Sequence, residues 1–388
     1  MAKSNSLVPL KMLLFSFHAS NTIILSFLPL YLLHKGLDGS EIGWVLAVGP
    51  LASIFAQPFW GYMSDKYKTV KRMLLLCVIG LLISSVLFFQ MNGLIAIILM
   101  GAVFYFFTSP IGALGDSLAQ RRSDQLNVSF GSIRMWGSIG FATSSLIVGE
   151  ILSSVGIQYM IWPYLFFGVA ALLVVFQLTD VKVESDPVKL KDVRQIFSNK
   201  PFLIFLAIIM FISISHRSND TYIGLYISQL GGSESLIGLA WFFGVASEAA
   251  VFAFAGTWFK KYHSLVFIIF AGVIYSIRWF MYAAVEDPIL IVALQFLHGI
   301  TFGVFYLAAF QYITRLIPKL LQSTGHLVFF AVFFGVSGII GSLIGGALID
   351  SFGGDTLYLV LGIFSSTGTI LLTLYHLLPY GKELKRSQ

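Results

Sequence analysis

The chain has 388 residues, of which 57% are hydrophobic and 11% are charged, and its mean hydropathy is +0.87. Because soluble domains carry about a quarter charged residues, this composition excludes an ordinary water-soluble globular protein. The net charge of +6 does not indicate nucleic-acid binding, since the basic residues follow a membrane topology. The single cysteine, Cys77, excludes an intrachain disulfide and forms no pattern for a Cys-based metal or redox site.

The first half of the chain contains six apolar segments, each long enough to cross a bilayer. A hydrocarbon core of about 30 Å requires roughly 20 apolar residues in a helix. The first segment continues without a small-residue cleavage site, so we interpret it as a span and not as a secretory signal. The predicted spans are 9–33, 42–63, 73–92, 94–119, 131–154 and 158–178.

A polar stretch at 180–200 follows and separates the first six spans from six more. It contains Pro187 and five basic residues, which is typical of a linker. The sequence therefore predicts an all-α polytopic membrane protein with an N-terminal half at 1–179 and a C-terminal half at 201–388. The later spans are 201–229, 235–258, 264–284, 288–313, 324–349 and 355–378.

An internal repeat indicates that the two halves are duplicates. Seven residues between positions 30 and 49 recur at an offset of 195, and a second pattern between 145 and 156 recurs at an offset of 197. Six spans separate the copies, so both copies have the same orientation in the membrane. Parallel halves of six helices are a transporter plan in which the substrate site lies near the midplane.

The basic residues predict the orientation. Of the 24 Lys and Arg, we place Arg134, Arg217 and Arg278 within spans and only Lys35 in an outward loop, and the other twenty fall on one side. By the positive-inside rule that side is cytoplasmic. We therefore expect both termini and the linker in the cytoplasm, with the chain in the inner membrane of the cell as a functional monomer.

The charged residues inside the first half predict a substrate site. A charge at the bilayer centre is costly and usually lines a cavity in a pair. Asp116 and Arg134 lie nine residues on either side of a helix–helix turn, so antiparallel helices place them at equal depth. Arg134, Ser138 and Phe141 share one helix face, and Asn21 offers a further hydrogen bond to a ligand. The alternative, that Asp116 and Arg134 only join two helices, stays open.

The second half carries a candidate proton-coupling set. Arg278 and His298 flank a helix–helix turn at comparable depth, and Glu248 faces them from the preceding helix. Burial raises the pKa of a carboxylate and a nearby arginine lowers it. Glu248 can therefore exchange protons as Arg278 approaches or withdraws. Alternatively, His298 is a hydrogen-bonded packing residue. Arg217 and Asp220 are spaced i, i+3, which also fits local neutralisation of the two charges.

Several motifs resemble a known family. Residues 57–66, QPFWGYMSDK, followed by basic residues at 71–72, resemble the signature between helices 2 and 3 of the major facilitator superfamily. The region 116–141 resembles helices 4 and 5 of lactose permease and of its phenylpropionate and nucleoside permease relatives. Further similarity to the same permeases lies at 297–298, 312–314 and 358–362.

The resemblance implies an alternating-access proton symporter. It places Asp116 at the acidic substrate position and Arg134 at the substrate-binding arginine, and it makes Glu248, Arg278 and His298 the coupling set. Two positions depart from the sugar permease pattern. Phe141 stands where that permease stacks a tryptophan on galactose, and Thr301 stands where it has a proton-carrying glutamate.

The resulting expectation is the uptake of a small polar organic solute such as a sugar, nucleoside or aromatic acid. A proton-coupled drug or metabolite exporter of the same superfamily is the alternative, although exporters usually carry a Gly-Pro pair in helix 5 and this chain has none there. We expect no enzymatic activity, because no nucleophile–base spacing is visible, and no channel, because no filter-like segment repeats. The expected partners are the solute, protons and the lipid bilayer, with no cofactor, no metal and no nucleic acid.

Overall fold

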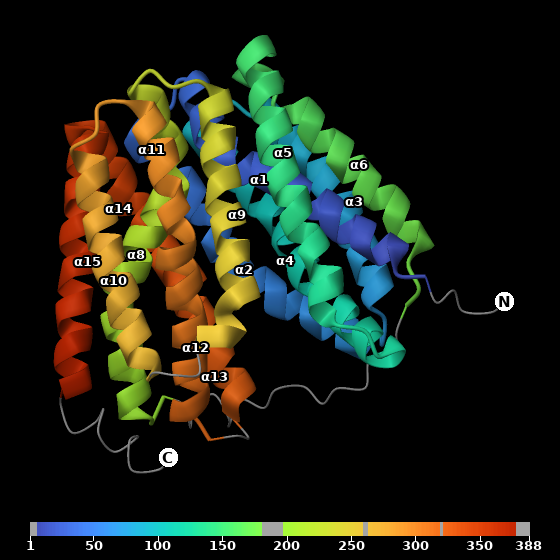
Figure 1. Ribbon diagram of the computed structural model, residues 1–388. Helices are drawn as coiled ribbons and strands as arrows, with labels where there is room; N and C mark the ends of the chain where they lie inside the picture. Colours follow the sequence, from blue (N-terminus) through green and yellow to red (C-terminus); the bar gives the residue numbers. More distant parts are fainter. Residues whose placement is uncertain (1–5, 181–196, 259–262, 319–320, 378–388) are drawn as a thin grey trace. The chain divides into compact units, whose positions relative to one another are not determined.

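The computed structural model of the chain describes residues 6–180, 197–258, 263–318 and 321–377, and all regular structure within these ranges is helical (Figure 1). Twelve helical segments in the described part are long and apolar enough to cross a membrane. The predicted all-α fold with twelve spans is therefore confirmed. Most of the predicted linker at 180–200 lies outside the described residues.

Each of the first six spans is one helix, apart from a short 3-10 turn, η1 (Ile157–Tyr159), that precedes the sixth. These helices are α1 (Val8–His34), α2 (Gly39–Lys66), α3 (Val70–Gln90), α4 (Leu94–Leu126), α5 (Phe130–Val155) and α6 (Ile161–Gln177).

Two of the later spans are composite. The tenth contains α11 (Pro288–Leu294), η2 (Gln295–Leu297), the π-helix η3 (Gly299–Gly303) and α12 (Val304–Leu316). The eleventh contains α13 (Gln322–Phe330), the π-helix η5 (Ala331–Val336) and α14 (Ser337–Phe352). The single-helix spans are α8 (Lys200–Gln229), α9 (Glu234–Trp258), α10 (Ser264–Ala283) and α15 (Gly354–Leu377).

Local sequence signals fix the helix ends. Asp38 precedes α2 and forms a capping box with Glu41, in which each side chain accepts a hydrogen bond from the other residue's backbone N–H. Asn127 ends α4 in the left-handed conformation, which asparagine tolerates better than most residues. Asp180 lies against the first turn of α3, where its Oδ1 accepts hydrogen bonds from the backbone N–H groups of Val70 and Lys71, both at 3.2 Å. The chain after α6 is thereby attached to the start of α3.

The helices form two compact units. The first comprises residues 1–187 and 231–242, and the second comprises 188–230 and 243–388. The boundary therefore passes through α9, whose first residues belong to the first unit.

Within the first unit, α1 packs closely on α5 (Figure 1). Gly140 makes this possible, because an added Cβ would overlap the backbone carbonyl of Phe15. One turn further along α5, the Ser144 hydroxyl donates to the carbonyl of Ala19 at 2.8 Å. Small residues permit such close helix contacts in membranes.

Candidate functional site

The first unit holds the predicted ion pair between α4 and α5. The Nε of Arg134 lies 3.0 Å from Oδ1 and 3.2 Å from Oδ2 of Asp116. The side chains of Arg134 and Asp116 remain 34% and 37% exposed. Only the Nε edge of the guanidinium faces the carboxylate, so the Nη groups remain available as donors for another molecule.

His18 of α1 lies beside this pair. Gly137 leaves room for both side chains, because an added Cβ would lie 2.5 Å from Cδ2 of His18 and 2.6 Å from Nη1 of Arg134. Nε2 of His18 is buried and makes no hydrogen bond with any described residue. The histidine thus adds a third polar group beside Asp116 and Arg134.

The remaining predicted substrate residues are half-buried. Ser138 and Phe141 follow Arg134 along α5, as predicted, and the Phe141 ring meets Trp241 edge to face at a centroid distance of 5.8 Å. Asn21 lies one turn beyond His18 on α1. These groups offer donors, acceptors and an aromatic edge to a small polar molecule.

The second unit buries a different polar network around Arg278 of α10. This arginine has no exposed surface. Its Nη1 donates to Oγ1 of Thr301 at 3.1 Å, its Nη2 donates to Oε1 of Gln295 at 2.5 Å, and both Nε and Nη2 donate to the hydroxyl of Tyr282. No carboxylate among the described residues lies within ion-pair distance of Arg278. A buried cation is therefore held by neutral acceptors alone.

Glu248 of α9 contacts His298 and not Arg278. Its Oε2 lies 3.7 Å from Nε2 of His298, and its side chain is 22% exposed. The approach of the two segments depends on Gly299, because an added Cβ would overlap the carbonyl of Ser247. The structure therefore brings together two members of the predicted coupling set, while the third faces Gln295 and Thr301 instead.

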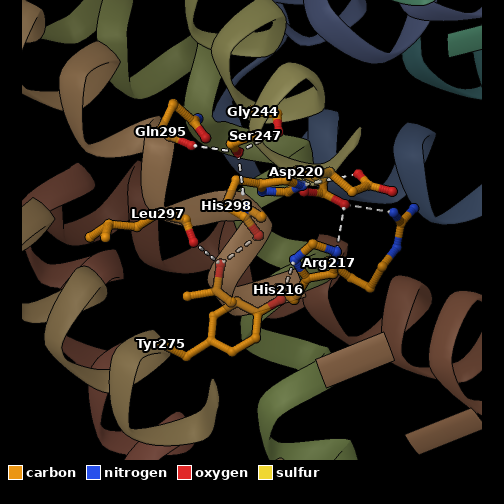
Figure 2. Close-up of polar contacts among 12 residues, drawn as sticks. His216, Arg217, Asp220, Gly244, Ser247, Tyr275, Gln295, Leu297 and His298 are labelled. Carbon is orange, nitrogen blue, oxygen red and sulfur yellow. Dashed lines mark hydrogen bonds and ion pairs between the residues drawn. The ribbon is translucent and has the colours of Figure 1, made fainter. Parts of the chain in front are cut away.

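A second charged group in this unit lies on one turn of α8 (Figure 2). The Oδ2 of Asp220 lies 2.8 Å from Nη1 of Arg217 and 3.3 Å from Nε2 of His216. The Nδ1 of His216 lies 3.1 Å from the hydroxyl of Tyr275 on α10. The predicted local pair of Arg217 and Asp220 is present, and a buried histidine extends it.

Sequence reasoning did not identify the neutral partners in the second unit. Tyr282 follows Arg278 by four residues and Gln295 precedes His298 by three, so both lie on the faces that carry those residues. This spacing is the sequence feature from which both residues could have been identified as neighbours of the predicted coupling set. Within the described ranges, no group of three or more His, Cys, Asp and Glu side chains is arranged to hold a metal ion.

Comparison with known proteins places these features in context. The model of the "MFS_1 like family" matches residues 7–360. The chain is 32% identical to the uncharacterized transporter YwbF of Bacillus subtilis over 93% of this chain and 91% of that protein, and 27% identical to the maltose permease of Geobacillus stearothermophilus over 87% and 86%.

The fold matches a solved transporter. The crystal structure of the nucleoside transporter NupG superposes with a TM-score of 0.84 at 17% identity, and the match covers 96% of this chain and 98% of that chain. The family match and the permease relatives confirm the predicted resemblance to this group of permeases, whereas the NupG match, at 17% identity, shows the fold alone.

Proposed function

Because the chain belongs to the MFS_1-like family of the major facilitator superfamily, we propose that this membrane transporter takes up a small polar organic solute together with protons. Like its relatives, the chain is a transporter and not an enzyme. The solute is a sugar, a nucleoside or an aromatic acid, and transport proceeds by alternating access. Both termini lie in the cytoplasm, and the monomer is the working unit in the inner membrane.

The observation that carries this proposal is the half-exposed pair of Asp116 and Arg134. A pair that only joined two helices would need no open surface, whereas each of these side chains keeps about a third of its surface open to another molecule. The carboxylate accepts hydrogen bonds and the free Nη groups donate them, which suits the adjacent hydroxyl, amide or carboxylate groups of such solutes. Ser138 and Asn21 supply further polar contacts, and Phe141 supplies a ring.

The similarity to a maltose permease supports a sugar as the first solute to test. That protein is 27% identical to this chain, so the sugar in its name guides the choice of the first solute to test.

Proton coupling is assigned to the second unit. Glu248 is the titrating carboxylate in this proposal, His298 positions it through their 3.7 Å contact, and Arg278 is the cation that approaches it in another state of the cycle. In this structure Arg278 binds Thr301 and Gln295, so an approach to Glu248 requires it to exchange these neutral acceptors.

A solute screen in proteoliposomes tests the function. Purified protein is reconstituted with a pH-sensitive dye inside the vesicles, and maltose, other sugars, nucleosides and aromatic acids are added outside one at a time. We expect one class to cause internal acidification in protein-containing vesicles and not in empty ones. Acidification by none of them, or internal alkalinisation as a solute enters in exchange for protons, would contradict the proposal, and the second result would indicate a proton antiporter of the exporter type.

A further inference from the structure

The Asp220 carboxylate has two unequal oxygens. Oδ2 accepts a hydrogen bond from Nη1 of Arg217 at 2.8 Å and lies 3.3 Å from Nε2 of His216. Oδ1 is buried and accepts no hydrogen bond from any described residue. An ionised carboxylate with an unpaired, buried oxygen is costly, because half of its charge lacks compensation. A proton on Oδ1 would remove that cost while Oδ2 stays beside Nε2 of His216.

The tautomer of His216 follows from its neighbours. Nε2 of His216 lies 3.3 Å from Oδ2 of Asp220, which as an ionised carboxylate only accepts hydrogen bonds, so the tautomer with its hydrogen on Nε2 suits this contact. The neutral imidazole then accepts at Nδ1 from the Tyr275 hydroxyl, 3.1 Å away. The ring is 2% exposed and stacks on Phe302 at 4.6 Å with an interplanar angle of 8°. His216 is therefore held by Tyr275 at Nδ1 and by Phe302 on its face, and its Nε2 lies against the Asp220 carboxylate.

Arg217 is the more exposed partner of the pair. Its side chain is 18% exposed, against 7% for Asp220, and its Nε makes no hydrogen bond with a described residue. Its guanidinium lies 5.7 Å from the ring centroid of Phe334 in the π-helix η5. The π-helix η3 contributes Phe302, which stacks on His216. Such π-helical turns occur frequently at functional sites.

We propose that Asp220 is a second proton-binding carboxylate of this transporter, which takes a proton on Oδ1 when Arg217 withdraws and releases it when Arg217 returns. This inference rests on the proposed proton coupling. In the first step one proton from water converts the carboxylate to a neutral carboxyl, while His216 stays neutral beside Oδ2. In the second step the proton returns to water and the ion pair with Arg217 forms again.

Other ionisable side chains surround the cluster. His298, which precedes η3, has its ring 5.7 Å from that of His216 and leads to Glu248 of α9. From η5 the neighbouring side chain is the phenyl ring of Phe334, which is not ionisable. From α10 and α15 the ionisable groups are Tyr275, Arg278 and Tyr358, the last through its 3.1 Å hydrogen bond to Asn219.

Difference infrared spectroscopy tests the proposal without a solute. The full chain, in vesicles of phosphatidylethanolamine and phosphatidylglycerol, is titrated from alkaline to acidic pH while the C=O stretch of protonated carboxyls is recorded. We expect two titrating bands from buried carboxyls, of which Asp220→Asn removes one and Glu248→Gln removes the other. Asp116→Asn is the matched control, because it makes the same change in another arginine-paired carboxylate, and it should leave both bands.

Two further comparisons distinguish loss of the Asp220 carboxyl from misfolding of a variant. Arg217→Gln and the double variant Arg217→Gln/Asp220→Asn differ only in the carboxyl, so the band should be present in the first and absent in the second. His216→Gln should keep the Asp220 band but change its titration midpoint, which a purely structural role would not do. The inference is overturned if no band depends on Asp220. Its outcome is separate from that of the proposed function, which fails if wild-type vesicles show no solute-driven proton uptake.

Discussion

Replacing Arg134 by lysine isolates the contribution of the planar guanidinium. Lysine keeps the positive charge near Asp116 but presents a single point donor in place of a rigid fork. In the structure one edge of the guanidinium, at Nε, is within 3.2 Å of both carboxylate oxygens, and the Nη groups remain for the solute. The variant therefore cannot bind Asp116 and a solute in the same geometry.

The size of the effect follows from charged hydrogen bonds, which contribute about 1.5–3 kcal/mol each. Both side chains of the pair are about one-third exposed, and solvent screening places the effect at the lower end of that range. We expect solute binding to Arg134→Lys to weaken by about 10- to 30-fold, since each 1.4 kcal/mol corresponds to a factor of ten.

Calorimetric titration of purified protein with the best solute from the screen measures this change. Arg121→Lys is the matched control, because Arg121 lies in the same unit near the end of α4 and its Nε donates to the Ser117 hydroxyl. Both variants should be as abundant and as thermally stable as the wild type. If Arg134→Lys binds normally, while Asp116→Asn and Arg134→Ala lose only stability, the pair is structural and the substrate site lies elsewhere.

Three further predictions follow from the topology, the coupling set and the packing. Cysteines introduced at Ser185 and Ser233 should react with an impermeant maleimide from opposite sides of the membrane, and labelling from one side would contradict the twelve-span topology. Glu248→Gln should abolish uphill accumulation but retain solute exchange at equal pH; continued accumulation would exclude Glu248 as a required coupling carboxylate. Gly140→Ala should destabilise the protein by about 1–3 kcal/mol in thermal unfolding through overpacking, whereas Gly131→Ala, whose added Cβ lies 3.5 Å from its nearest neighbour, should be nearly neutral.

The number of spans was predictable because apolar length is a property of the sequence itself. The ends were less so. The second span was predicted to end at residue 63 and the fourth at 119, yet α2 continues to Lys66 and α4 to Leu126. These helices continue past their apolar stretch into polar residues, and hydropathy detects only the apolar part. The π-helical turns were not predictable either, since they depend on contacts with other helices.

In the candidate site, too, one feature was predictable from the sequence and another was not. Counting from one turn placed Asp116 and Arg134 at equal depth, and they do form a pair. The same reasoning grouped Glu248 with Arg278, but depth alone does not fix the rotation of a helix about its axis. In the second unit that rotation directs Arg278 to Gln295 and Thr301.

The tight packing of α1 on α5 makes these two helices suitable as an internal ruler for spectroscopy. Backbone contact at Gly140 and the hydrogen bond from Ser144 to Ala19 leave the two helices no room to slide without losing both. Spin labels placed one on each helix should report the same separation with and without solute and at every pH. A distance that stays constant under all conditions provides a fixed reference frame, against which the displacement of any other labelled helix can be read as motion of that helix alone.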